Sequence, residues 1–424
     1  MIYTDYKPKY LVMVETSSRG DGVDHNKFYS MNPINDSVFE VEYGRVGATH
    51  MKKRYARDKW DKIYSEKIAK GYVDQTEFHI VSSVDTTNVK GKTYKDIAID
   101  SIRDLVGKML SWANMVISKN YTVSTDQVSQ EAVDKAQDIL DNLADKMGTM
   151  SVWEFNERLK SLFLVIPRKM AAVDKFLAKD QRDFEEIIDR EQSLLDTIGV
   201  SAGKTVVSKK ATDGEQTVLE ANGLEIRECT PEELKGVKDH LDPETKQRFM
   251  NAWHVTNKES RERFDAYCKK HKIGKRGIKY YYHGSRNANY WNIAVQGLKI
   301  RPTQKVTRAG AMFGHGLYFA PKAKKSMGYT DGGFWSNRTN SSTSQKTVLL
   351  MVFKVAMGKS KDLDCFSPTV ANWHEADCRK AGYDSVFAHA SNNPGIGTGR
   401  LFNDECIVYN DDAATISYIL QLSA

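Results

Sequence analysis

Three short segments in the second half of this 424-residue chain hold side chains suited to chemistry. The first runs from three tyrosines into a His-Gly-Ser turn at His283, and the second is a glycine-flanked aromatic stretch around Tyr318. The third places a carboxylate, Glu405, inside an apolar, β-prone run. A buried carboxylate costs free energy unless it is paired or used, which makes Glu405 a candidate reacting group. As a single residue it is equally compatible with an outward-facing strand position.

The aromatic residues of the second segment suggest a slot for a flat heteroaromatic ring. Tyr318 leads into a predicted short helix with Ser326 and a further tyrosine, Tyr329. Stacking between two tyrosines contributes about 0.5–1.5 kcal/mol beyond area burial. The alternatives are a glycine-tolerant strand packed in a core and, for His283, a structural histidine at the end of a strand.

Short strands and helices must position these residues. From about residue 218 to the C-terminus the sequence mixes both, and a short helix is expected around 289–295, ended by Gly297. Residues 199–216 are rich in Gly, Ser, Thr and Lys with few large apolar residues, which predicts a linker or an exposed loop.

Two regions with different patterns lie upstream. Residues 9–55 contain three β-prone runs separated by turn residues, and a helix is expected at about 57–70, capped by Gly71. Residues 96–198 carry apolar side chains at helical spacing and predict a bundle of four helices.

The bundle has recognisable helix ends. Ser151 and Glu154 fit a capping box at the start of its third helix, and Pro167 ends that helix. The fourth helix is predicted from Val173 to a stop at Gly199.

Composition favours an intracellular protein with a weak preference for anionic partners. Apolar residues make up 40% and charged residues 28% of the chain, and the formal net charge is +7. The five cysteines include no C-x-x-C pair, so we expect neither a disulfide framework nor a zinc site. The first six residues lack an apolar signal core, and the longest apolar runs are too short to span a bilayer.

Together the three segments resemble the catalytic signature of the poly(ADP-ribose) polymerase branch of the ADP-ribosyltransferases. His283 matches the family histidine of a His-Gly-Ser-Arg motif, and Tyr318 matches the tyrosine of a Gly-x-Tyr-Phe-Ala strand. Glu405 matches the glutamate that precedes an Ile-Val-Tyr strand. Each motif alone would be a weak signal, whereas three in this order are specific.

The resemblance implies an NAD⁺ cleft with assigned roles and no metal. His283 would position the adenosine-side ribose by hydrogen bonding. The remaining NAD⁺-binding positions that it implies are Gly284 and Ser326 on the nicotinamide amide, Tyr329 stacked on the ring, Ser285 and Asn289 near the ribose, and Lys299, where relatives often carry Arg. At this position the single ammonium group of lysine replaces the guanidinium of arginine, which can form two parallel hydrogen bonds.

The implied chemistry suits a carboxylate. Cleavage of the nicotinamide–ribose bond builds positive charge on the ribose, as in glycoside transfer. Glu405 near the ribose can stabilise that charge and hold the 2′-hydroxyl. It can also help to deprotonate an incoming hydroxyl acceptor.

The N-terminal region resembles the WGR domain, which binds DNA ends in this family. Tyr43, Gly44 and Arg45 match its Trp-Gly-Arg motif, with Tyr in place of Trp. Residues 51–70 hold eight Lys or Arg against three Asp or Glu, a net charge of 8 − 3 = +5. Basic residues beside aromatic ones suit a phosphate backbone, although a solvated basic helix is the alternative. The predicted DNA contacts are Tyr43, Gly44, Arg45, Lys52, Lys53 and Arg54.

Residues 96–198 resemble the helical regulatory domain of the family, most clearly at 162–167. The implied role is to shield the NAD⁺ cleft until DNA binding loosens it. The expected fold is therefore multidomain α+β: a small sheet-plus-helix WGR-like domain, an all-α bundle and a C-terminal mixed α/β transferase with two packed sheets. The predicted boundaries are 1–88, 92–200, a linker or loop at 201–217, and 218–424.

The favoured function is NAD⁺-dependent ADP-ribosyl transfer stimulated by DNA ends or nicks, in DNA damage and repair. The acceptors would be proteins, including the enzyme itself, and Glu405 is compatible with elongation of poly(ADP-ribose). Two alternatives stay open: transfer of single units to protein or DNA ends, and a non-enzymatic DNA-end-binding scaffold. The expected location is nuclear in a eukaryote and cytoplasmic or nucleoid-associated in a bacterium.

Overall fold

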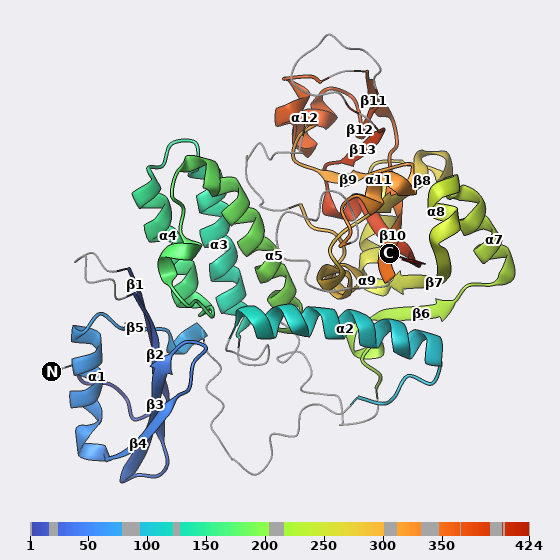
Figure 1. The fold of residues 1–424 in the computed structure, drawn as a ribbon. Helices are drawn as coiled ribbons and strands as arrows, with labels where there is room; N and C mark the ends of the chain where they lie inside the picture. The colour runs from blue at the N-terminus through green and yellow to red at the C-terminus, as the bar shows by residue number, and fades with distance from the viewer. Residues whose placement is uncertain are drawn as a thin grey trace. The chain divides into compact units, whose positions relative to one another are not determined.

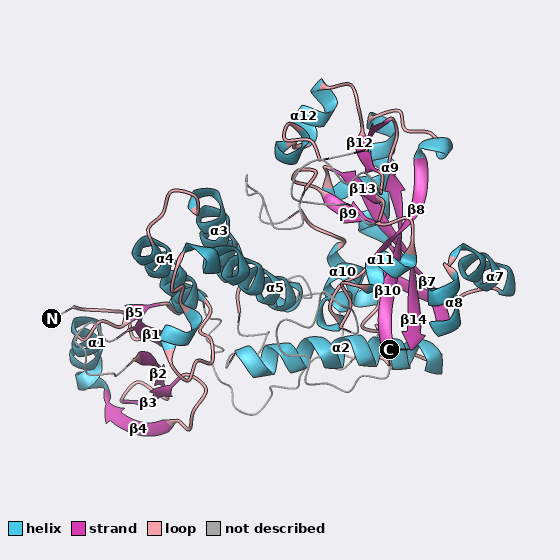
Figure 2. Ribbon diagram, turned by 45° about the horizontal axis from the view of Figure 1, so that its top comes forward, coloured by secondary structure: helices cyan, strands magenta, loops and turns pink. Residues whose placement is uncertain are grey.

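Figures 1 and 2 show the fold of the chain in a computed structural model. The structure describes residues 2–16, 24–78, 94–121, 128–202, 216–300, 312–331, 347–364, 366–390, 401 and 403–423. The chain divides into two compact units. The first contains Met1–Gly91 and Met115–Lys210, and the second contains Lys92–Asn114 and Ala211–Ala424. Helix α2 contributes residues to both units, and most of the predicted linker lies outside the described residues.

The first unit begins with a five-stranded antiparallel sheet in the order β4-β3-β2-β1-β5. Apolar side chains from its strands pack with Trp60 and Tyr64 of the adjoining helix into one core. The elements are β1 (Lys9–Glu15), β2 (His25–Pro33), β3 (Val38–Arg45), β4 (Met51–Ala56), α1 (Trp60–Ala69) and β5 (Val73–Asp74).

The basic residues just before the predicted helix form the edge strand β4, a further strand beyond the three predicted β-prone runs. Lys52, Lys53 and Arg54 lie in this strand, and only the residues from Trp60 onward form α1. The strand is favoured because the alternation directs Tyr55 to the core side, where it stacks on Phe39. Gly71 follows the helix with a φ of 89°, as its predicted capping role requires.

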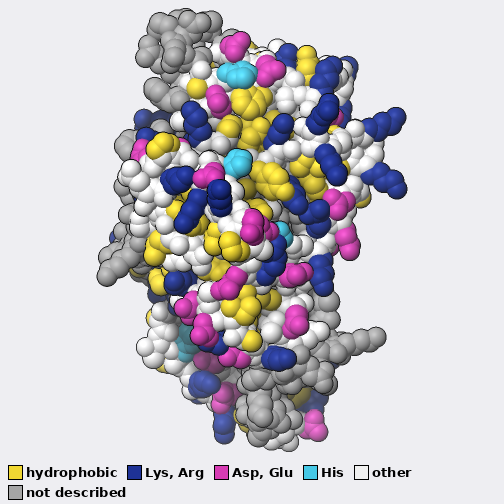
Figure 3. All heavy atoms as spheres, turned by 90° about the vertical axis from the view of Figure 1, so that its right-hand side faces the viewer, with side chains coloured by type: hydrophobic (Ala, Val, Ile, Leu, Met, Phe, Trp, Pro, Cys, Tyr) yellow, Lys and Arg dark blue, Asp and Glu magenta, His cyan; other side chains and the backbone are white. Residues whose placement is uncertain are grey.

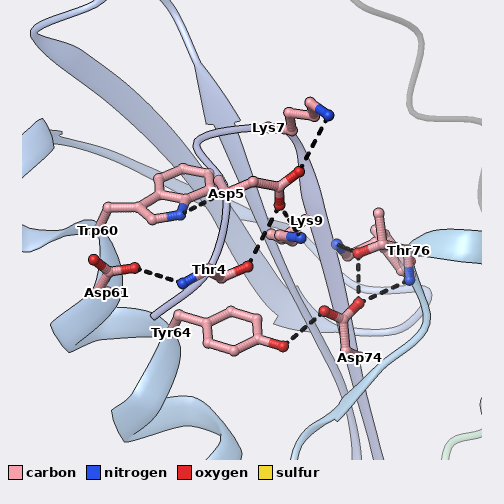
Figure 4. Close-up of polar contacts among 10 residues, drawn as sticks. Thr4, Asp5, Lys7, Lys9, Trp60, Asp61, Tyr64, Asp74 and Thr76 are labelled. Carbon is pink, nitrogen blue, oxygen red and sulfur yellow. Dashed lines mark hydrogen bonds and ion pairs between the residues drawn. The ribbon is translucent and has the colours of Figure 1, made fainter. Parts of the chain in front are cut away.

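The segment before β1 fastens α1 to the sheet (Figure 4). The Thr4 backbone amide donates to an Asp61 carboxylate oxygen at 2.9 Å, and the Trp60 indole donates to the Asp5 carbonyl at 3.1 Å. At the other side, the Tyr64 hydroxyl donates to Asp74 in β5 at 2.8 Å. These bonds hold the helix against the β1–β5 side of the sheet.

Four helices follow, as the apolar periodicity predicted. They are α2 (Asp100–Asn120), α3 (Gln130–Lys146), α4 (Val152–Val165) and α5 (Phe184–Ala202). The predicted capping box at Ser151 and Glu154 is confirmed at the start of α4. The prediction that the fourth helix begins at Val173 was wrong: residues 173–176 and 181–183 are separate 3₁₀ turns, and α5 begins at Phe184 and continues past Gly199.

The second unit contains two sheets, a larger antiparallel one and a smaller mixed one in which β11 and β12 are parallel. The larger has the order β6-β7-β14-β10-β8, and the smaller has the order β11-β12-β13-β9. Its strands are β6 (Leu224–Glu228), β7 (Phe249–Asn257), β8 (Ile278–His283), β9 (Leu317–Phe319), β10 (Thr347–Ala356), β11 (Ser360–Leu363), β12 (Ser385–Ala388), β13 (Glu405–Val408) and β14 (Ala414–Ser423). Its helices are α7 (Pro231–His240), α8 (Pro243–Arg248), α9 (Lys258–Lys270), α10 (Tyr290–Gln296), α11 (Ala323–Met327) and α12 (Glu375–Lys380).

The two sheets meet where β8 touches β9. The Tyr282 amide donates to the Ala320 carbonyl at 2.9 Å, and the reverse bond measures 3.0 Å. Among the described helices none is long and apolar enough to cross a membrane. Within the described ranges no group of three or more His, Cys, Asp or Glu side chains is arranged to hold a metal ion.

Candidate active site

The three predicted motifs converge because β9 lies between the strands that carry the other two. On one side β9 pairs with β13, where Phe319 is opposite Cys406, the neighbour of Glu405. On the other side Ala320 pairs with Tyr282, the neighbour of His283. Strand pairing therefore brings together residues that are more than a hundred positions apart in the sequence.

His283 is held as a neutral hydrogen-bond acceptor. Its Nδ1 lies 3.0 Å from the Tyr318 carbonyl oxygen, which can only accept, so Nδ1 carries the proton. Burial lowers the pKa of the imidazole below its ordinary value of 6.5, and the bond to Tyr318 offsets part of that effect. In the neutral ring Nε2 is left as an acceptor, suited to a hydroxyl donor.

Gly284 and Ser326 are in van der Waals contact across the two motifs. A Cβ atom built on Gly284 would lie 1.7 Å from the Ser326 carbonyl oxygen, so only glycine fits. Ser326 lies in α11, is 4% exposed, and donates its hydroxyl hydrogen to the Tyr282 carbonyl at 3.0 Å. The two residues predicted to hold one amide group therefore form a single preorganised corner.

The two predicted stacking tyrosines differ in their surroundings. The Tyr318 hydroxyl accepts from the Phe313 amide at 3.0 Å and donates to the Gly314 carbonyl at 2.8 Å, and burial raises its pKa, so it stays protonated. Tyr329 follows α11 and is 48% exposed. Its pKa is raised by partial burial and by the negative charge of Glu405. The ring of Tyr329 thus has a free surface on which a planar ligand could stack.

Glu405 has one oxygen in an ion pair and one without a partner. Oε1 is paired with the ammonium of Lys325, and the two side chains are 10% and 12% exposed. Oε2 is buried and, within the described residues, accepts no hydrogen bond. A buried acceptor without a hydrogen-bond donor lowers the stability of the fold, and a ribose hydroxyl could donate the missing hydrogen bond.

Lys325 is a candidate site residue that sequence reasoning missed. It precedes Ser326 in α11, and one turn of helix presents the two side chains to different neighbours. Its position next to a predicted binding residue was the only available signal, because the pairing with Glu405 spans 80 positions in the sequence.

The remaining predicted NAD⁺ positions lie on two separate segments. Asn289 donates to the Ser285 hydroxyl at 3.0 Å, and the Ser285 amide donates to the hydroxyl of Tyr290 at 3.2 Å. Ser285 and Asn289 thus belong to the turn that follows His283. Lys299 instead forms an ion pair with Asp411 at 3.3 Å, so its charge is already compensated.

Comparison with known proteins agrees with this arrangement. A model of the poly(ADP-ribose) polymerase catalytic domain matches residues 232–424. The chain is 31% identical over 183 residues to the uncharacterized protein 101L of Invertebrate iridescent virus 6, covering 43% of this chain and 75% of that protein. The present chain belongs to the poly(ADP-ribose) polymerase family.

Other relatives match over a shorter share of their length. A poly [ADP-ribose] polymerase-like protein of the same virus is 29% identical over 143 residues, which is 33% of this chain and 68% of that protein. Poly [ADP-ribose] polymerase 2 of Homo sapiens is 28% identical over 159 residues, which is 33% of this chain and 26% of its own. The protein is accordingly an enzyme, an ADP-ribosyltransferase that uses NAD⁺ as its substrate.

The neutral state of His283 predicts an acid limit for NAD⁺ binding. Protonation places a hydrogen on Nε2 and removes the acceptor, and it occurs only below the lowered pKa, hence below pH 6.5. We expect KM for NAD⁺ to be constant near neutral pH and to rise on the acid side. The unfolded state binds more protons between the lowered pKa and 6.5, so stability also falls as pH drops through that window.

Two variants separate this effect from general acid unfolding. His283→Gln should raise KM at all pH values and abolish its rise at low pH. His254 of β7 also has a pKa lowered by burial, so His254→Gln is a matched control that should keep the acid rise. An unchanged profile in His283→Gln would contradict the role given to His283.

The predicted DNA contacts are engaged within the first unit to different degrees. Arg45 donates to three backbone carbonyls: Asp24 at 3.1 Å, Ala171 at 2.5 Å and Met170 at 3.5 Å. Its guanidinium therefore joins the sheet to the loop after α4 and is not free for phosphate. Gly44 lies against the Thr49 carbonyl, 3.2 Å from a built Cβ.

The other predicted contacts lie on the two faces of the sheet. Lys52 and Arg54 are on one face with Glu40 and Glu42, and the Arg54 guanidinium lies 3.1 Å from Glu40. Exposed pairs of this kind are worth about 0–1 kcal/mol and exchange easily for phosphate. On the α1 face Tyr43 stacks on Tyr29 at 5.4 Å, and the neighbouring Lys53 lies over Tyr55.

Proposed function

We propose that the protein transfers ADP-ribose from NAD⁺ to protein acceptors, including itself, and that DNA strand breaks stimulate the reaction. The buried Oε2 of Glu405, which accepts no hydrogen bond within the described residues, carries the transferase part of this proposal. The β9 segment pairs both with the strand of Glu405 and with the strand of His283, whose neutral Nε2 is a second acceptor. A ribose hydroxyl supplies a donor for each. The same carboxylate is compatible with attack by a ribose hydroxyl of a growing chain, and hence with elongation.

In the proposed reaction these residues bind, orient and move protons. Gly284 and Ser326 hold the carboxamide, and Tyr329 stacks on the nicotinamide ring. As the bond from ribose to nicotinamide breaks, the bonding pair leaves with the nicotinamide and positive charge grows on the ribose. Glu405 stabilises that charge and accepts the proton of the attacking hydroxyl. Lys325 holds the carboxylate in place through Oε1.

DNA dependence is supported by the bonds that join the N-terminal sheet to the helical region within one unit. Arg45 and Asp24 bind the backbone of residues 170–174, and Asn26 donates to the Arg168 carbonyl at 2.9 Å. Arg168 is in turn paired with Glu191 of α5, and both are nearly fully buried. A phosphate backbone that displaced strand β4 or its turn would disturb this chain of contacts.

The test is incubation of the purified protein with labelled NAD⁺, with and without nicked or blunt-ended DNA. The proposal expects covalent label, a sharp rise with DNA and faster amide exchange in α3, α4 and α5 when DNA is added. Equal labelling with and without DNA would support the transferase activity and contradict its stimulation by DNA. Gel mobility separates polymer from single units, which decides between elongation and mono-ADP-ribosyl transfer.

A variant of Arg45 tests the link itself. Arg45→Ala removes charge-assisted bonds to three carbonyls, so we expect the free energy of unfolding to fall by about 1–3 kcal/mol and the DNA stimulation to decrease. Urea unfolding and the labelling assay measure the two effects. Arg182→Ala is the control, since it removes an exposed Arg of the same unit that is paired with Asp180 and lies outside the predicted DNA contacts, and exposed pairs of this kind contribute little to stability. Equal losses of stability and of DNA stimulation in both variants would contradict the role given to Arg45.

A further inference from the structure

The segment from α9 to β8 is the most basic part of the second unit. Residues 269–279 contain six Lys or Arg and no Asp or Glu. Every one of the six side chains is exposed. Figure 3 faces the side of the unit on which Figure 1 places α7 and β8, and Lys and Arg side chains gather in the upper half of that face.

The turn between β10 and β11 adds further positive charge at the same place. The Gly358 amide donates to the Gly277 carbonyl at 3.0 Å, so Lys359 follows directly beside the basic loop. Lys359 and Lys361 both lie over the ring of Tyr383, each 5.1 Å from its centroid. We call the set of Lys272, Lys275, Arg276, Lys359 and Lys361 the basic surface.

The acidic side chains nearby are already engaged with other groups. Asp384 is paired with Arg379 and accepts from the Lys359 amide at 2.7 Å. Glu375 accepts from Asn410 at 2.6 Å, and Asp362 lies 2.9 Å from the His389 ring. Within the described part of the chain, no carboxylate forms an ion pair with a member of the basic surface.

Helix capping explains only part of this charge. Lys269 and Lys270 lie in the last turn of α9, where cations stabilise the helix dipole. Lys272 lies beyond the helix with a φ of 56°, a left-handed conformation that favours glycine or asparagine. Lysine thus occupies a position where its backbone is strained, and neither Lys359 in the β10–β11 turn nor Lys361 in β11 belongs to a helix end.

We propose that the basic surface binds the phosphate backbone of a nucleic acid on the transferase unit itself. Uncompensated cations that follow a loop and a neighbouring strand suit a chain of phosphates. Aromatic rings accompany them: Lys359 and Lys361 lie over the ring of Tyr383, and Tyr280 of β8 is 52% exposed with Lys354 over its ring. Rings beside cations favour a nucleic acid over other polyanions, because unpaired bases can stack there. This surface is separate from the strand β4 that the proposed DNA dependence uses.

The test compares two triple variants of the full chain. Lys275→Gln, Arg276→Gln and Lys359→Gln neutralise the basic surface. Lys235→Gln, Lys246→Gln and Lys258→Gln make the same change of net charge at exposed positions on α7, α8 and α9. Fluorescence anisotropy with a labelled single strand and its duplex is recorded between about 50 and 200 mM salt, the range in which counterion release is pronounced.

The basic-surface variant should bind the single strand about tenfold or more weakly at the lowest salt, and its slope of log K against log salt should fall by about 2. The control should keep both values. Oligonucleotide should slow amide exchange in residues 269–279, and NAD⁺ turnover without DNA should be unchanged. Equal binding by the two variants overturns the proposal. So does a loss confined to heparin or poly(ADP-ribose), with DNA binding intact. Neither result depends on whether DNA stimulates transfer.

Discussion

Replacing Glu405 with glutamine should lower kcat for ADP-ribosyl transfer by about 10²- to 10⁴-fold. The amide keeps the shape of the side chain but removes its negative charge and its ability to accept a proton. The charge on the ribose develops only in the transition state, so we expect the loss in kcat and a small change in KM for NAD⁺. Quenched-flow measurement of nicotinamide release gives both values.

The control for this variant is Glu244→Gln, the same chemical change at an exposed ion pair with Lys324. It should leave both kinetic constants unchanged. Glu405→Gln also leaves the ammonium of Lys325 without its counter-charge, so thermal unfolding must be recorded to exclude a folding defect. A folded Glu405→Gln enzyme with more than a tenth of the original kcat would contradict the role assigned to this carboxylate.

The sequence predicted which three motifs come together, but not every side chain around them. His283, Tyr318 and Glu405 could be proposed as site residues because each lies in a short motif with fixed spacing. Lys325 could not, since its partner is distant in the sequence and only the pairing of β9 with β13 brings the two segments together. Contacts made by strand pairing leave no local periodicity to detect.

The same limit applies to contacts in the first unit. Three exposed basic residues in a row have no helical or strand preference of their own, and β4 forms because β3 offers an unpaired edge. Arg45 was predicted to contact DNA, yet its guanidinium is held by carbonyls 125 residues away. By contrast, the capping box at Ser151 was predictable since both of its bonds lie within three residues.

Replacing Gly284 with alanine should inactivate the enzyme by about 10²-fold or more and destabilise the second unit by about 1–3 kcal/mol. The added methyl group would lie 1.7 Å from the Ser326 carbonyl oxygen, which is a backbone atom and cannot rotate away. Either β8 or α11 must move by more than 1 Å, and that shift displaces the His283 turn from the corner that should hold the carboxamide. The measurements are KM and kcat for NAD⁺ together with urea unfolding.

Gly236→Ala in α7 provides the opposite expectation for the same substitution. Nothing lies within 4 Å of a Cβ atom built there, and alanine is favoured over glycine inside a helix by about 0.5–1 kcal/mol. That variant should be slightly more stable and fully active. If Gly284→Ala behaved in the same way, the contact between the His-Gly-Ser turn and α11 would not be needed to shape the NAD⁺ cleft. A rise in KM larger than the fall in kcat would instead show that this corner acts mainly in holding NAD⁺.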